Sequence, residues 1–120
     1  MTRRWIAAAV AALAVTAGAG EALAQANEIR VCLITGRTGP LEAYARQTEV
    51  GFMMGLEFLT QGSMQINGRR INVIVKDDQL RPDRGRALLE ECYNDDRADL
   101  AVGTTGSPVA LAMLPVAEEA

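Results

Sequence analysis

The chain has 120 residues, of which 49% are hydrophobic and 22% are charged, and its formal net charge is −3. This composition is typical of a globular protein rather than a disordered one, and the length is sufficient for one small core. The chain is mildly acidic and its basic residues are scattered. No nucleic-acid partner is expected, because that function requires clustered lysine and arginine.

The first 24 residues have the pattern of a secretory signal peptide. Arg3 and Arg4 precede an apolar stretch, which ends in a small-x-small motif at residues 22–24. A transmembrane anchor is the competing interpretation, but a span needs about 20 continuous apolar residues, and polar or glycine residues interrupt this stretch between positions 16 and 21. We expect cleavage after Ala24, with Ala26 as second choice. The paired arginines also resemble, weakly, a twin-arginine signal.

The next segments predict a strand, a helix and a hairpin. Residues 28–35 (EIRVCLIT) form a nearly continuous apolar run that ends at Gly36, which is typical of a strand buried on both faces. Residues 41–61 have a mainly apolar stripe at three- and four-residue steps (positions 41, 44, 48, 52, 56 and 59), and Pro40 suits the first turn of this helix. Residues 64–66 and 71–77 flank Asn67-Gly68, so we expect a hairpin whose second arm is the second main strand.

The remaining segments continue the alternation. A helix is expected from Pro82, with residues 85, 88, 89 and 92 on its buried face. A third strand is expected at 100–102, followed by a helix with Ser107 as its N-cap and Pro108 as its first helical residue. The order β-α-β-α-β-α predicts an α/β fold, an open parallel sheet with helices on both faces. Three main strands are few for such a sheet, so residues 25–120 are expected to be an incomplete N-terminal lobe.

The topology also predicts where a ligand binds. In an open α/β sheet, ligands bind beyond the carboxyl ends of the strands, where the strand order reverses. With strand order 2-1-3, this crevice lies between the loops 36–43 and 104–107, and the positive end of the last helix favours an anion such as a carboxylate. Simpler explanations remain open at this point: Ser107 as a helix cap only, residues 38–40 as a turn only, and Arg37 as an exposed loop charge.

The sequence contains few of the motifs that enzymes require. There is no GxGxxG or GxxxxGK[ST] motif and no histidine, so phosphate loops and histidine-based triads are missing from this segment. Asp77 and Asp78 are more simply solvated or turn-capping than metal-binding, and Met53 and Met54 are more simply core residues than ligands. We therefore expect no enzyme activity, no metal and no cofactor.

Several ordered motifs resemble the opening of the branched-chain amino acid-binding proteins of ABC importers, which are type I periplasmic binding proteins. No single motif is decisive, but their order and intervals are specific, and the resemblance covers essentially residues 28–120. The motifs are IRV at 29–31, TGP at 38–40 with Tyr44, INGRRI at 66–71, VKDDQ at 75–79, AVGTTGS at 101–107 and PVAEE at 115–119.

The resemblance implies a two-lobed, Rossmann-like periplasmic protein. Such a protein closes on an amino acid or a related carboxylate or amide and delivers it to an inner-membrane ABC permease. By the same resemblance, Ser107 hydrogen-bonds the ligand carboxylate, helped by its loop neighbours Thr105 and Gly106. Tyr44 then lines the side-chain pocket, and Thr38 borders the cleft. Arg37, beside the same cleft, would suit a more acidic solute.

Some positions depart from the family pattern. Gly106 stands where members often carry a second hydroxyl, and Leu80 stands where some carry a disulfide cysteine. Cys32 and Cys92 can pair with each other in an oxidising compartment, or each can be a separate buried thiol. Both alternatives remain open from the sequence.

The resemblance also defines alternatives for function. Family members are several times longer, and their second lobe holds the ligand's amino group, so residues 25–120 alone are expected to show negligible ligand binding by calorimetry. A ligand-sensing ectodomain of the same fold is the main alternative to a transport protein. A secreted α/β enzyme is a third class, which would need catalytic residues from elsewhere.

Overall fold

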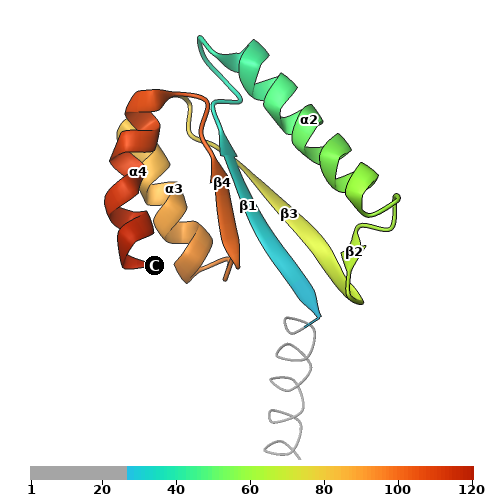
Figure 1. The fold of residues 1–120 in the computed structure, drawn as a ribbon. Coiled ribbons are helices and arrows are strands. Elements are labelled where there is room, and N and C mark those ends of the chain that lie inside the picture. Colours follow the sequence, from blue (N-terminus) through green and yellow to red (C-terminus); the bar gives the residue numbers. More distant parts are fainter. Residues whose placement is uncertain (1–26) are drawn as a thin grey trace, which may run out of the picture.

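The computed structural model describes residues 27–120, so the expected signal peptide at residues 1–24 lies outside the described residues. Strands and helices alternate in the order that the sequence predicts, with one extra short strand from the hairpin (Figure 1). The elements are β1 (Glu28–Thr35), α2 (Glu42–Leu59), β2 (Gln65–Ile66), β3 (Arg69–Asp77), α3 (Pro82–Asn94), β4 (Leu100–Gly103) and α4 (Ser107–Glu119).

The sheet has four strands in the order β2-β3-β1-β4. β1 is parallel to both β3 and β4, while the short β2 is antiparallel to β3. The three main strands therefore have the predicted 2-1-3 order. Figure 1 shows α2 on one face of the sheet and α3 with α4 on the other. Because β1 has a strand on each side and helices over both faces, residues 31–36 are buried.

The main core lies between the sheet and the α3–α4 pair. Cys32 and Ile34 of β1 pack there with Leu89 of α3 and with buried apolar residues of α4. Gly85 lets the two helices approach closely, because a Cβ at this position would lie 2.2 Å from Val109 Cγ1. The predicted buried face of α3 is confirmed, with residues 85, 89 and 92 buried and residue 88 half-buried.

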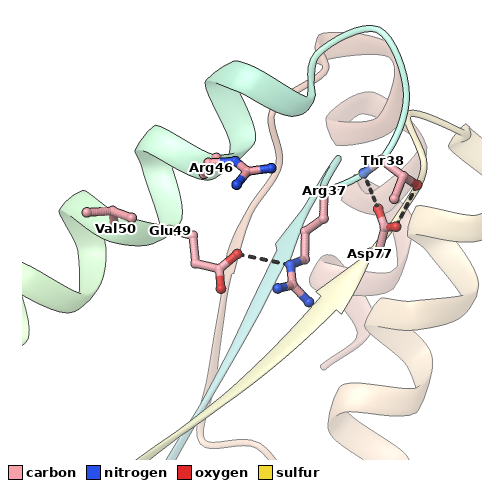
Figure 2. Close-up of a pocket in the computed structure, with 6 residues that line it drawn as sticks. All are labelled: Arg37, Thr38, Arg46, Glu49, Val50 and Asp77. Atoms are coloured by element: carbon pink, nitrogen blue, oxygen red, sulfur yellow. Dashed lines mark hydrogen bonds and ion pairs between the residues drawn. The ribbon is translucent and has the colours of Figure 1, made fainter.

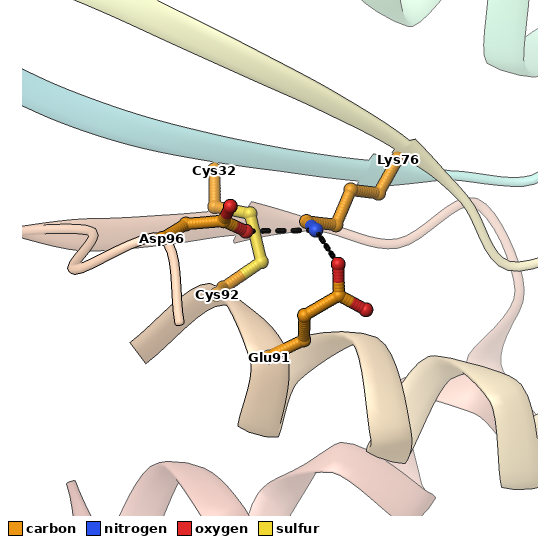
Figure 3. The surroundings of a disulfide bond; sticks show 5 residues. All are labelled: Cys32, Lys76, Glu91, Cys92 and Asp96. Atoms are coloured by element: carbon orange, nitrogen blue, oxygen red, sulfur yellow. Dashed lines mark hydrogen bonds and ion pairs between the residues drawn. A yellow bond between two sulfur atoms is a disulfide. The ribbon is translucent and has the colours of Figure 1, made fainter. Parts of the chain in front are cut away.

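A disulfide bond between Cys32 and Cys92 joins the central strand to α3 (Figure 3). Both cysteines are fully buried, and their Cα atoms lie 6.1 Å apart, within the usual range for a disulfide. The structure thus resolves the alternative that the sequence leaves open. Of the side chains in residues 27–120, the one group of three with metal-ligand spacing comprises these two cysteines and Asp96, and the disulfide already joins its two sulfur atoms.

Lys76, the only lysine of the chain, lies beside the disulfide (Figure 3). Its Nζ lies 2.7 Å from Asp96 Oδ2 and also pairs with the Glu91 carboxylate. Partial burial lowers the pKa of Lys76, but hydrogen bonds to these two carboxylates outweigh burial and hold the pKa above its ordinary value. The ion pairs fasten the end of α3 to β3.

Helix α2 covers its face of the sheet only in part. Ala45 is its one buried residue, whereas Tyr44 is 64% exposed and Leu59 is 78% exposed. The sequence groups Tyr44 and Leu59 with the apolar stripe of this helix, and the structure does not bury them. Periodicity identifies a helix face, but the elements available to cover that face decide its burial. Within residues 27–120, no helix combines the length and the hydropathy that a bilayer span requires.

Candidate functional site

Three loops meet at the carboxyl edge of the sheet, where β1, β3 and β4 end. The N–H of Gly36, directly after β1, donates a hydrogen bond of 3.2 Å to Thr105 Oγ1 in the loop after β4. This contact brings together the two loops that strand order predicts as neighbours. At the end of β4, a Cβ on Gly103 would lie 2.3 Å from the Ile34 carbonyl oxygen, so glycine permits the close approach of β4 to β1.

Ser107 begins helix α4 instead of capping it. Gly106 is the N-cap, with extended backbone angles, and its carbonyl accepts hydrogen bonds of 3.0 Å from the N–H groups of Val109 and Ala110. The predicted cap is therefore wrong by one position, because the backbone is still extended at Gly106 and becomes helical at Ser107. Ser107 is exposed, and within residues 27–120 no protein group hydrogen-bonds to its hydroxyl or N–H. Within the described residues, both groups therefore have no hydrogen-bond partner, and they lie at the positive end of α4.

Arg37 and Thr38 line a cavity of about 340 Å³ between the β1–α2 loop and helix α2 (Figure 2). Arg37 Nε lies 3.0 Å from Glu49 Oε2, which directs the guanidinium toward α2. Residues 105–107 are not part of this lining, so Arg37 and Ser107 do not share this cavity. The lining residues are Arg37, Thr38, Arg46, Glu49, Val50 and Asp77.

Asp77, at the end of β3, holds the β1–α2 loop. The Thr38 hydroxyl donates to Asp77 Oδ2 at 2.7 Å, and the N–H groups of Thr38 and Gln79 donate to Oδ1 at 3.3 and 3.0 Å. Partial burial raises the pKa of Asp77, but these hydrogen bonds outweigh burial and hold the pKa below its ordinary value. Thr38 is thus fixed to the strand end through an ionised carboxylate.

Asp78 has a different environment from its neighbour. Its side chain is fully buried, Oδ1 accepts a hydrogen bond of 2.7 Å from the Leu80 N–H, and Oδ2 accepts one from the Thr104 hydroxyl. Of the two alternatives for this position, the solvated one is wrong, because Asp78 is fully buried. The turn-capping one is confirmed, because the Leu80 N–H, two residues further along, donates to the Asp78 carboxylate. The available signal is the alternation of side chains along a strand, since two adjacent carboxylates at a strand end face opposite sides.

A family model described as periplasmic binding protein matches residues 28–120. The chain belongs to the periplasmic binding protein family. A search of the curated proteins found no significant match. The family match confirms the resemblance that the sequence motifs show, and it covers nearly all of the residues that the structure describes.

Solved periplasmic binding proteins share this fold. An ABC-type branched-chain amino acid transporter protein from Rhodopseudomonas palustris is 60% identical, with a TM-score of 0.76 over 77% of this chain and 25% of that chain. A solute-binding protein of the same species in complex with benzoate is 26% identical (TM-score 0.68; 77% and 25% covered). One from R. palustris BisB5 in complex with 3,4-dihydroxybenzoic acid is 29% identical (TM-score 0.71; 78% and 25% covered). The chain thus spans about a quarter of the length of these relatives.

Proposed function

We propose that this periplasmic binding protein acts in the solute-binding component of an ABC importer. In this proposal it captures a branched-chain amino acid, or a related small carboxylate or amide, in the periplasm for delivery to an inner-membrane permease. The observation that carries the proposal is Ser107 at the N-terminus of α4, whose hydroxyl and N–H have no hydrogen-bond partner within residues 27–120. A carboxylate at this position would meet two hydrogen-bond donors and the positive end of the helix dipole.

The named relatives support a carboxylate as the common feature of the ligand. One is a branched-chain amino acid transporter protein, and two are complexes with benzoate and 3,4-dihydroxybenzoic acid. Amino acids and aromatic acids differ in ring and amino group but share the carboxylate. We therefore assign the Ser107 loop to the carboxylate and leave the remainder of the ligand to other parts of the cleft.

The other candidate residues take supporting roles in this proposal. Thr105 and Gly106, directly before Ser107 in the chain, are assigned to bind the same carboxylate through their backbone N–H groups. Tyr44, which is exposed in the first turn of α2, lines the pocket for the rest of the ligand, and Thr38 borders the cleft. Arg37 contacts an acidic solute only if it leaves its ion pair with Glu49.

A chimera provides the test. Residues 28–120 replace the matching segment of the 60%-identical R. palustris protein, so that the site is present in a chain of the relatives' length. Calorimetry with L-leucine, benzoate and 3,4-dihydroxybenzoate should detect binding of at least one. Ser107→Ala should then weaken that binding about tenfold or more, because a hydrogen bond to a charged group contributes about 1.5–3 kcal/mol.

Two controls make this test decisive. Ser63→Ala changes the only other serine of the chain, whose hydroxyl donates to the Thr60 carbonyl away from the site, and it should leave the affinity unchanged. If Ser107→Ala binds like the unmodified chimera, Ser107 is not the carboxylate anchor. If the parent R. palustris protein binds one of the three compounds and the chimera binds none, the proposed function fails for this segment.

Export to the periplasm is a separate part of the proposal and has its own test. It depends on the signal-peptide pattern of residues 1–24, which lie outside the described residues. The N-terminus of the secreted protein should be Gln25, read by mass spectrometry of the periplasmic fraction. An unprocessed N-terminus at Met1 in that fraction would contradict this assignment.

A further inference from the structure

Asp78 is a fully buried carboxylate that no step of the proposed binding uses directly. Its two oxygens accept hydrogen bonds from the Leu80 N–H and the Thr104 hydroxyl, and its own N–H donates to the Thr35 carbonyl at 3.0 Å. A buried carboxylate is expensive unless hydrogen bonds compensate it, and an apolar residue of similar size would often serve stability as well. Stability alone therefore does not explain the presence of Asp78, and its hydrogen-bond partners indicate what else it does.

The partners of Asp78 belong to the loop that carries Ser107. Thr104 is held by Asp78 Oδ2, and the next residue, Thr105, accepts the Gly36 N–H at 3.2 Å. Leu80, whose N–H binds Asp78 Oδ1, packs against Gly106 so closely that a Cβ there would lie 2.4 Å from Leu80 Cδ1. Each of the three residues before Ser107 is thus fixed by a different contact, and two of these contacts lead back to Asp78.

We propose that Asp78 is a positioning residue, which fixes the loop 104–106 and so directs the Ser107 hydroxyl and N–H toward the ligand. The effect on ligand binding rests on the proposed function, whereas the fixing of the loop 104–106 by Asp78 does not. A loop that is ordered before binding loses less conformational freedom when the ligand arrives, and affinity rises accordingly. Asp78 acts through Thr104 and touches no ligand itself.

The test uses the chimera and two readouts. Asp78→Asn and Thr104→Val should each weaken binding of the best ligand among L-leucine, benzoate and 3,4-dihydroxybenzoate about tenfold, while Thr104→Ser keeps the hydroxyl and restores affinity to within about threefold. The second readout is amide hydrogen exchange of Gly36 without ligand, by fragmentation mass spectrometry. The Gly36 N–H donates to Thr105 in the loop and not to Asp78. About tenfold faster exchange of this N–H in Thr104→Val would therefore report that the loop is displaced.

The outcomes separate the two proposals. Asp95→Asn, an exposed aspartate without a side-chain partner in residues 27–120, controls for the change of charge and should alter neither readout. Normal Gly36 exchange and normal affinity in Asp78→Asn and Thr104→Val would overturn the positioning role, even if both variants melt at lower temperature. If the unmodified chimera binds none of the compounds although the parent R. palustris protein binds one, the proposed function fails, and Gly36 exchange alone decides whether Asp78 positions the loop.

Discussion

Reduction of the disulfide removes the link between β1 and α3 without removing an atom from the core. Cys32 and Cys92 are 60 positions apart, so the bond closes a loop of that length in the unfolded chain. The loop-closure relation gives an entropy of about 14 cal/mol/K, which is about 4 kcal/mol at room temperature. Because a domain has a stability of about 5–15 kcal/mol in total, we expect reduction to remove a large share of it.

Urea unfolding followed by circular dichroism, with and without reductant, measures this difference. The oxidised protein should unfold with a free energy about 4 kcal/mol higher. A double variant, Cys32→Ala with Cys92→Ala, has no thiols and should respond to urea identically with and without reductant. A difference below about 1 kcal/mol between oxidised and reduced protein, with unchanged urea dependence, would refute the loop-closure argument.

Gly85→Ala should lower the free energy of unfolding by about 1–3 kcal/mol, because its Cβ would lie 2.2 Å from Val109 Cγ1 and overpacking outweighs the gain in helix propensity of up to about 1 kcal/mol. Gly55→Ala in α2 should show only the gain, because the added Cβ meets no atom of the described residues within 4 Å beyond its chain neighbours and the adjacent helix backbone. Thermal melts that rank the two variants in the opposite order would contradict this. Thr38→Val removes a hydrogen bond that holds the pKa of Asp77 below 3.8, its ordinary value. Since the folded pKa is the lower one, this stabilisation is present above the ordinary value and disappears as the pH falls through the folded pKa. Urea unfolding should therefore separate Thr38→Val from the unmodified protein by more at neutral pH than in acid, once Asp77 is protonated in the folded protein. An equal difference at both would refute the role of Asp77.

Local sequence signals predict much of the fold. The strand at 28–35 is predicted with its observed bounds, because a short apolar run that ends at Gly36 is typical of a buried strand. Asn67 and Gly68 adopt positive φ angles of 50° and 77°, as the hairpin turn requires of this dipeptide. The burial of α2 is not predictable in the same way. Its side chains at 44 and 59 belong to the expected stripe, yet no described element covers them.

The sequence predicts those contacts of the site that follow from sheet topology, but not those that depend on side chains far away in the sequence. The contact between Gly36 and Thr105 follows from the rule that carboxyl ends of parallel strands share one edge. Alternation along the strand separates Asp78 from Asp77, but the hydroxyl partner of Asp78 is Thr104, 26 positions further along, and local composition carries no sign of that contact. The disulfide likewise depends on how α3 packs on β1, so spacing alone leaves Cys32 and Cys92 undecided.

β1 is the first strand in the sequence but the middle strand of the sheet. Its partners lie 42 positions further along at Glu28↔Arg70 and 69 positions further along at Val31↔Leu100. Contacts of such long range form slowly, because the intervening chain loses entropy before any pairing compensates it. The β4 side of β1 is therefore unpaired, and its apolar face toward α3 and α4 uncovered, until these later segments join, and a refolding chain is most prone to aggregate in this interval. Substitutions in β1 should accordingly change the refolding rate, whereas those on the exposed face of α2 should not.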